Sequence, residues 1–130
     1  MIYIGTSGYS YQDWQNVFYP ENLKKEKQLE YYSKEFNFLE LNYSFYRIPK
    51  ATNLANMEKS VPDAFRFALK LHQNFTHERQ FEPDFLQALT GFSGKLAVLL
   101  AQFPYSFKFN PDNQDYLLRL RDYFSGYPLV

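Results

Sequence analysis

Polar side chains that could act on a substrate fall where the predicted strands of this chain end. In residues 38–42, Glu40 and Asn42 alternate with Leu39 and Leu41, which indicates a strand with one polar and one apolar face. A carboxylate on a buried strand face is costly unless a partner or a function requires it there. Glu40 is therefore a candidate for proton transfer, and Asn42 is a candidate for binding substrate.

Two further candidates for catalysis follow from the next predicted strand, residues 65–70. Lys70 ends this strand and could bind phosphate, form a Schiff base or stabilise an anion. His77 lies in the loop that follows and could act as an acid or a base. Plainer interpretations stay open, with Lys70 as an exposed charge and His77 as a solvated loop residue. Glu40 could instead form an internal ion pair with Arg66 or Lys70.

Small residues, rings and amides lie near the other strand ends. Residues 5–8, Gly-Thr-Ser-Gly, allow a close backbone approach, but they lack the lysine of a Walker loop. Loop aromatics could stack on a sugar or a base. With two histidines and no cysteine, no metal site or other cofactor is expected. These features predict a substrate-binding set of Thr6, Ser7, Tyr9, Trp14, Asn42, Tyr46 and Gln102.

Strands and helices alternate along the chain, and this order must bring the strand ends together. Alternation of this kind is typical of an α/β fold with a parallel sheet, in which ligands bind beyond the carboxyl ends of the strands. The strand faces opposite the helices carry polar residues, which favours a barrel over an open sheet covered on both sides. Strands are predicted over residues 2–5, 38–42, 65–70 and 96–102, a fifth begins at 128–130, and helices are predicted over 24–36, 52–60, 83–90 and 112–124.

Two helices carry more detailed predictions. Thr52 has the side chain of a helix cap, so it is expected at the start of the helix over residues 52–60. In the helix over residues 112–124, the apolar spacing predicts four side chains that face the core, which are Tyr116, Leu117, Leu120 and Phe124.

Composition narrows the class of protein. The chain has 130 residues, enough for one domain with a core. Its 14 Lys and Arg residues balance 14 Asp and Glu residues, so no global field attracts nucleic acid or an acidic membrane. The lack of cysteine, of a signal peptide and of an apolar run of ~20 residues predicts a cytoplasmic protein without a membrane partner. Aromatic residues make up 21% of the chain, and most are expected in the core.

The strand-end motifs resemble those of the YecE-like family, the seventy-second family of domains of unknown function. The resemblance covers nearly the whole chain in the correct order, although Tyr9 and Met57 stand where the family usually has tryptophan. It implies a TIM-like barrel of ~250 residues, of which residues 1–130 would be the N-terminal half with the first four βα units. The matching residues are 4–11, 14, 18–20, 40–42, 45–46, 49, 65–70, 76–77, 102–104 and 106–107.

Three functions are consistent with these features. The first is an enzyme for a phosphorylated, sugar-like or nucleic-acid-derived substrate, with Lys70 and Gln102 holding an anionic or carbonyl oxygen. The second is a nucleic-acid-binding protein without catalysis, whose aromatic loops stack on bases while cations meet phosphates. The third is a half-barrel that associates with a missing C-terminal half or with a second copy, because its sheet edges and inner face would be open.

Overall fold

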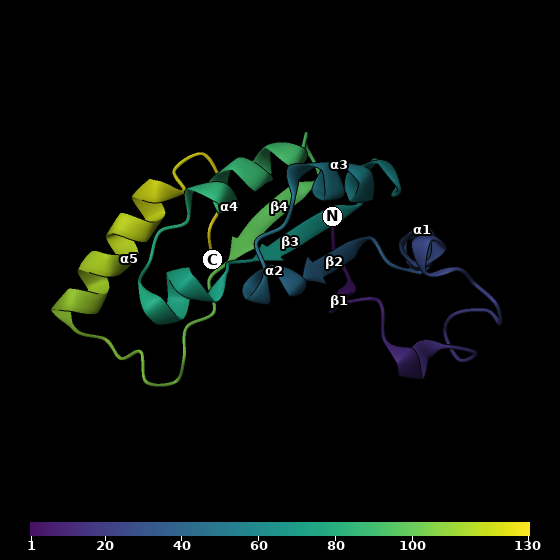
Figure 1. The fold of residues 1–130 in the computed structure, drawn as a ribbon, viewed down its shortest axis with the longest axis horizontal. Helices are drawn as coiled ribbons and strands as arrows, with labels where there is room; N and C mark the ends of the chain where they lie inside the picture. Colours follow the sequence, from purple (N-terminus) through teal and green to yellow (C-terminus); the bar gives the residue numbers. More distant parts are fainter.

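The computed structural model describes residues 1–130 as one parallel sheet with helices layered against it (Figure 1). The predicted α/β class is confirmed. None of the helices is both long and apolar enough to cross a bilayer. The strands are β1 (Gly5–Ser7), β2 (Phe38–Leu41), β3 (Arg66–Lys70) and β4 (Leu96–Leu100). The helices and helical turns are η1 (Gln12–Trp14), η2 (Lys25–Lys27), α1 (Gln28–Glu35), α2 (Tyr43–Tyr46), α3 (Ala51–Lys59), η3 (Asn74–Glu78), α4 (Pro83–Ala88), η4 (Leu89–Gly91) and α5 (Pro111–Tyr123).

The strands lie in the sheet in the order in which they occur in the chain. Each pairs in parallel with the next, and Leu39 of β2 lies beside Phe67 of β3. The predicted start of a fifth strand is confirmed, because Leu129 pairs in parallel with Leu99 and Leu99 N donates to Pro128 O at 2.8 Å. Because all the strands are parallel, their carboxyl ends lie together at one edge of the sheet.

The first strand begins at Gly5, so the prediction of a strand over residues 2–5 is wrong. Residues 2–4 are held largely by a side chain, since Ile4 N donates to Asn37 Oδ1 at 2.7 Å and Asn37 Nδ2 donates to Ile2 O at 3.0 Å. At Gly5 the two strands approach closely, because an added Cβ would lie 1.8 Å from Phe38 O. Only glycine fits at this position of β1.

Four local predictions also differ from the structure. The loop expected after β2 contains the one-turn helix α2, and η3 is a π-helical turn within the loop expected after β3. Thr52 does not cap α3, which begins at Ala51 after an extended Lys50. Leu117 is 43% exposed, because α5 packs through Tyr116 and Leu120 on a stripe that excludes it.

The core lies between the sheet and the helices. The strands contribute Leu39, Phe67 and Leu99, each fully buried, and the helices contribute buried side chains such as Leu54 and Phe85. Burying a side chain of this size contributes ~1.5–3 kcal/mol. The fully buried aromatic rings belong to this core, as the sequence predicts, and they are Tyr19, Tyr32, Phe65, Phe67, Phe75, Phe85 and Phe124.

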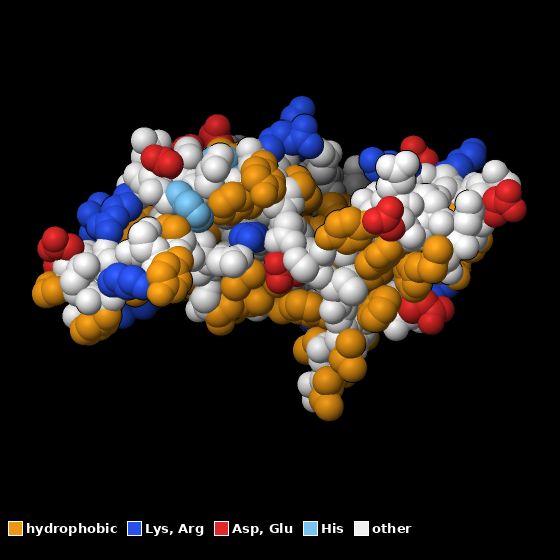
Figure 2. Space-filling model, turned by 90° about the horizontal axis from the view of Figure 1, so that it is seen from below, with side chains coloured by type: hydrophobic (Ala, Val, Ile, Leu, Met, Phe, Trp, Pro, Cys, Tyr) orange, Lys and Arg blue, Asp and Glu red, His pale blue; other side chains and the backbone are white.

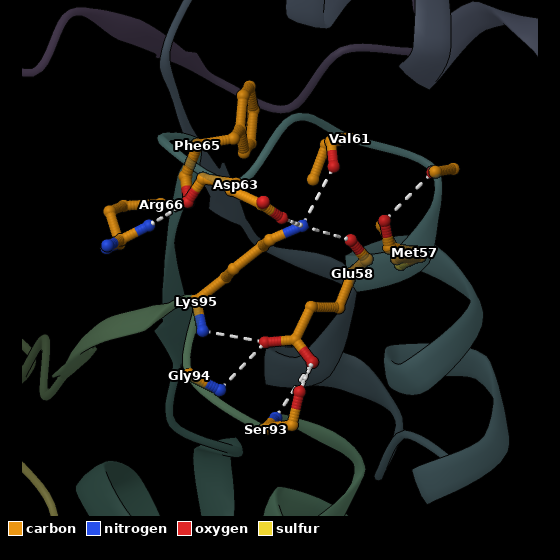
Figure 3. A network of polar contacts seen from close by, with 10 residues as sticks. Met57, Glu58, Val61, Asp63, Phe65, Arg66, Ser93, Gly94 and Lys95 are labelled. Carbon is orange, nitrogen blue, oxygen red and sulfur yellow. Dashed lines mark hydrogen bonds and ion pairs between the residues drawn. The ribbon is translucent and has the colours of Figure 1, made fainter.

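A buried carboxylate fastens the end of α3 to the loop that leads into β4 (Figure 3). Glu58 is 5% exposed, and its oxygens accept from Ser93 N (2.8 Å), Ser93 Oγ (2.5 Å), Gly94 N (3.0 Å) and Lys95 N (2.6 Å). Lys95 Nζ donates to Glu58 O at 2.9 Å and to Val61 O at 2.8 Å. Burial alone would raise the pKa of the Glu58 carboxyl, but these donors outweigh it and hold the pKa below its ordinary value.

Glu58→Gln should lower the free energy of unfolding by about 3 kcal/mol at neutral pH, because buried N–H groups lose their charged acceptor. The folded pKa lies below the unfolded one, so the contribution is complete above the unfolded value of about 4.3 and is lost as pH falls through the folded value. Urea unfolding from neutral to about pH 3 measures both effects. The control Glu35→Gln removes an exposed carboxylate and should change little. A Glu58→Gln protein with wild-type stability and acid sensitivity would contradict this explanation.

Candidate functional site

The polar groups that follow β1 and β2 meet at the carboxyl ends of these strands. Ser7 Oγ donates to Glu40 Oε1 at 3.1 Å, and Asn42 Nδ2 donates to Ser7 Oγ. The loop after β1 is fixed by Gly8 N, which donates to Glu40 O at 2.9 Å. Asn42 Oδ1 is buried and has no hydrogen-bond partner within the chain. Three residues predicted from two strand ends are thus brought together, with one amide oxygen left without a partner.

The predicted ion pair of Glu40 with Arg66 or Lys70 is wrong. Glu40 lies in register with Ala68, whereas Arg66 lies two residues toward the amino end of β3. Arg66 Nη1 donates to Asp63 O at 2.6 Å and to Phe65 O at 2.8 Å instead. The Arg66 guanidinium therefore lies toward the amino end of β3, away from Glu40. The Glu40 carboxylate has Ser7 as its only hydrogen-bond donor from a side chain.

A hollow of about 650 Å³ lies beside this cluster and is lined by several kinds of polar group and ring. Burial, with a smaller contribution from Tyr9, raises the pKa of Tyr43 to about 12, while Arg47 opposes the shift. Burial also raises the pKa of Tyr9. Both phenols therefore stay neutral donors near pH 7. The lining residues are Gly8, Tyr9, Ser10, Tyr11, Lys25, Glu40, Leu41, Asn42, Tyr43, Arg47, Asn53, Asn56 and Met57.

The sequence prediction missed part of this lining. Asn53 and Asn56 come from α3 and present two amides to the hollow, and Lys25 adds a cation. A signal was available, because asparagine is a poor residue for a helix interior and two of them three positions apart share one face. Lys25 carries no such signal, since it lies in a run of lysines before α1.

A smaller hollow of about 300 Å³ contains the other predicted catalytic residues. Lys70, His77 and Gln102 line it together with Phe45, Phe103, Pro104 and Tyr105. The ring of His77 is fixed, because its Nδ1 lies 2.8 Å from Thr76 Oγ1 and its centroid lies 5.2 Å from that of Phe45. The structure therefore divides the predicted site into two hollows, with Glu40 in the larger and Lys70 and His77 in the smaller.

Helix α2 separates the two hollows. Tyr43 lines the larger hollow and Phe45 lines the smaller one. Between them, Ser44 is fully buried, and its Oγ lies 3.1 Å from Leu41 O and 2.5 Å from Lys70 O. The Ser44 hydroxyl thus joins the ends of β2 and β3 beneath α2. It thereby sets the position of the neighbouring rings of Tyr43 and Phe45.

Four residues of the predicted substrate-binding set line neither hollow, although one of them, Ser7, donates to Glu40 beside the larger hollow. Thr6 is used within the fold, since Thr6 N donates to Tyr32 OH at 2.8 Å and Thr6 Oγ1 donates to Gly8 O at 2.6 Å. Trp14 packs against Tyr11 and other rings of the N-terminal segment. Tyr46 is 75% exposed on the outer side of α2.

The fold and this site define an α/β protein with a parallel sheet and polar hollows at the carboxyl ends of its strands. Residues 3–130 match the family described as "Protein of unknown function DUF72", and the chain belongs to that family, which confirms the resemblance seen in the sequence. It is 36% identical over 129 residues to the UPF0759 protein YunF of Bacillus subtilis (strain 168), covering 90% of this chain and 45% of YunF. The chain thus spans about half the length of this relative.

Solved structures of the same family share the fold. A DUF72 family protein from Thermotoga maritima MSB8 has a TM-score of 0.75 and 34% identity, over 99% of this chain and 54% of that one. A DUF72 family protein from Enterococcus faecalis V583 has a TM-score of 0.83 and 24% identity, over 99% of this chain and 49% of that one. Each similarity extends along nearly the whole of this chain and about half of the solved one.

Ser44→Ala should lower the free energy of unfolding by about 1–2 kcal/mol, since a buried hydroxyl that bonds two strand ends is lost. Urea unfolding measures the loss, and faster amide exchange in residues 43–46 would place it at α2. The matched control is Ser60→Ala, because Ser60 Oγ also donates to the carbonyl three residues earlier, at 2.8 Å from Met57 O, but lies exposed. Equal effects of the two substitutions would contradict a special role for Ser44.

Proposed function

We propose that this chain carries the binding site of an enzyme that acts on a phosphorylated, sugar-like or nucleotide-derived small molecule. The observation that carries the proposal is the lining of the larger hollow. Flat phenol rings suit the face of a sugar or base, and the amides suit its hydroxyl and carbonyl groups. Lys25 and Arg47 add positive charge, which favours a substrate with an anionic group.

Within this proposal, Glu40 transfers the proton. One of its oxygens accepts from Ser7 Oγ, and the other is free to accept from a substrate hydroxyl. The Asn42 Oδ1 atom, buried without a partner, would accept a hydrogen bond from a ligand or a water that enters the hollow. Tyr9 and Tyr43 donate from neutral hydroxyls. These roles need no rearrangement of the strands.

Glu40→Gln should preserve ligand binding and lower turnover by about a hundredfold or more, because loss of a general base typically costs that much. Asn53→Ala combined with Asn56→Ala should weaken binding by about tenfold. Calorimetry with a panel of sugar phosphates and nucleoside monophosphates identifies the ligand, and product formation measures turnover. Asp13→Asn, on an exposed turn outside the hollow, is the control. Full turnover by Glu40→Gln would rule out Glu40 as the base.

We further propose that the sheet is the first half of a TIM-like barrel. The sequential parallel order and the helices on one face support this, as do the several groups of hydrophobic side chains exposed on the side of the molecule seen in Figure 2. Val98 and Leu100 of β4 are only partly buried, and Ile2 and Ile4 are 79% and 63% exposed. In the longer relatives, additional chain is available to cover such a face.

The 130-residue chain should therefore associate, either with a second copy or with a C-terminal half supplied separately. Sedimentation should show a mass above that of the 15.6 kDa monomer. Val98→Lys should shift it toward the monomer, because a charge on the apolar face opposes burial. Leu118→Lys, on the exposed side of α5, is the control. A wild-type monomer that stays dispersed at high concentration and melts sharply would argue against the half-barrel.

Binding of single-stranded nucleic acid is a second candidate function. Tyr46 and Tyr105 are 75% and 92% exposed, and Lys108 Nζ lies 3.6 Å from the centroid of the Tyr105 ring. Exposed rings beside cations stack on bases with little dependence on sequence. An oligonucleotide in the ligand panel separates the two functions. Binding that falls steeply with salt and is unaffected by Asn53→Ala and Asn56→Ala would favour nucleic acid.

A further inference from the structure

The smaller hollow collects polar groups that the chain itself leaves without partners. Lys70 Nζ takes part in no ion pair and lies 4.9 Å from the centroid of the Phe45 ring. The Gln102 side chain makes no hydrogen bond within the chain, and His77 uses only Nδ1, beside Thr76 Oγ1. Three side chains that can donate hydrogen bonds thus line one cavity of about 300 Å³ with their donor atoms free.

The strand register explains why these groups converge. Lys70 pairs with Leu100, so the two side chains share one face of the sheet, and Gln102 follows on that face two residues later. Leu71 N donates to Leu100 O at 2.9 Å, which keeps β3 and β4 paired up to this point. Lys70 at the end of β3 and Gln102 just beyond the end of β4 therefore lie at the same edge of the sheet, where both line the cavity.

Aromatic rings form the other walls of the cavity. Phe45 packs against the His77 ring, and Phe103 stacks on Phe107 with centroids 4.1 Å apart. The hollow is open to solvent, since His77, Gln102 and Tyr105 are exposed, so a small anion can reach the Lys70 ammonium group. No carboxylate lines this cavity, so no group of the chain competes for the Lys70 charge.

We propose that this smaller hollow is a separate phosphate subsite, in which Lys70, Gln102 and His77 hold the phosphoryl group of the substrate. The inference rests on the proposed enzyme function and names its substrate class as a phosphate monoester. The ring of that substrate lies across α2 in the larger hollow. Lysine binds phosphate as a point charge, and the amide and imidazole donate to the remaining oxygens. A cavity of this size admits a phosphoryl group.

Titration of the full chain with inorganic phosphate, followed by amide chemical shifts, tests the subsite directly. Phosphate should shift the signals of residues 70–77 and 100–105. Lys70→Met should weaken its binding by about tenfold or more, Gln102→Ala should weaken it a few-fold, and Lys70→Arg should restore most of it. Lys59→Met, which removes an exposed cation at the far end of α3, is the matched control and should bind as wild type does. Acetate should bind more weakly than phosphate.

Two results would overturn the subsite. One is equal phosphate affinity of the Lys70→Met and Lys59→Met proteins. The other is a shift pattern centred on Arg47 and Lys25, which would place the anion in the larger hollow. If Lys70→Met does not fold, Gln102→Ala decides, because Gln102 is exposed and its truncation leaves the core intact. Phosphate binding that depends on Lys70 without turnover of any phosphate monoester would uphold the subsite and reject the enzyme. Turnover of a phosphate monoester that Lys70→Met leaves unchanged would uphold the enzyme and reject the subsite.

Discussion

The parallel pairing of β2 with β3 determines the position of nearly every polar group in the two hollows. Because Leu39 pairs with Phe67 and Leu41 with Leu69, the apolar side chains of both strands enter one core, and Glu40 and Lys70 must lie on the other face. In this register the last residue of β2, Leu41, pairs with Leu69, one residue before the end of β3. The shorter β2 leaves space for α2 at the carboxyl ends of the two strands. A slip of one residue would bury a carboxylate and an ammonium among leucines, at a cost that exceeds the stability of a small domain.

The two ends of the sheet differ in how their polar groups are satisfied. At the amino end of β4, the Glu58 carboxylate accepts four hydrogen bonds and the Lys95 ammonium donates to two carbonyls. At the carboxyl end, Asn42 Oδ1, Lys70 Nζ and the Gln102 amide have no acceptor or donor within the chain. Of these three groups only Asn42 Oδ1 is buried, and the free-energy cost of burying it without a partner would be offset by a donor from a ligand.

The sequence predicts well those features that depend on local pattern. Alternation in residues 38–42 and 65–70, and the apolar run that ends before Gln102, are sufficient to place three strands and to put Glu40, Lys70 and Gln102 near their ends. The family resemblance adds that the chain corresponds to about half of its relatives. The first strand is misplaced because Ile2 and Ile4 have strand propensity, while the partner they find is the side chain of Asn37, 33 residues from Ile4.

Features that depend on contacts between distant residues are not predictable in this way. The sequence predicts an aromatic loop over residues 43–46. In the structure these residues form a helix whose Ser44 hydroxyl donates to Lys70 O, 26 residues away. An ion pair of Glu40 with Arg66 is plausible from their types, but the register sets them apart. Likewise Leu117 fits the apolar spacing of its helix as well as Tyr116 does, and only the packing of α5 shows which of them faces the core.

Helix α2 also determines how substitutions can alter the two hollows independently. Tyr43 and Phe45 are two positions apart and face different hollows, while Ser44 between them holds the helix to the sheet. A substitution at Tyr43 alters the shape of one hollow, and a substitution at Phe45 alters the other, without moving a strand. Under the proposed function, affinity for the ring and affinity for the charged group of a ligand can therefore diverge separately in related proteins, through single changes within one turn of helix.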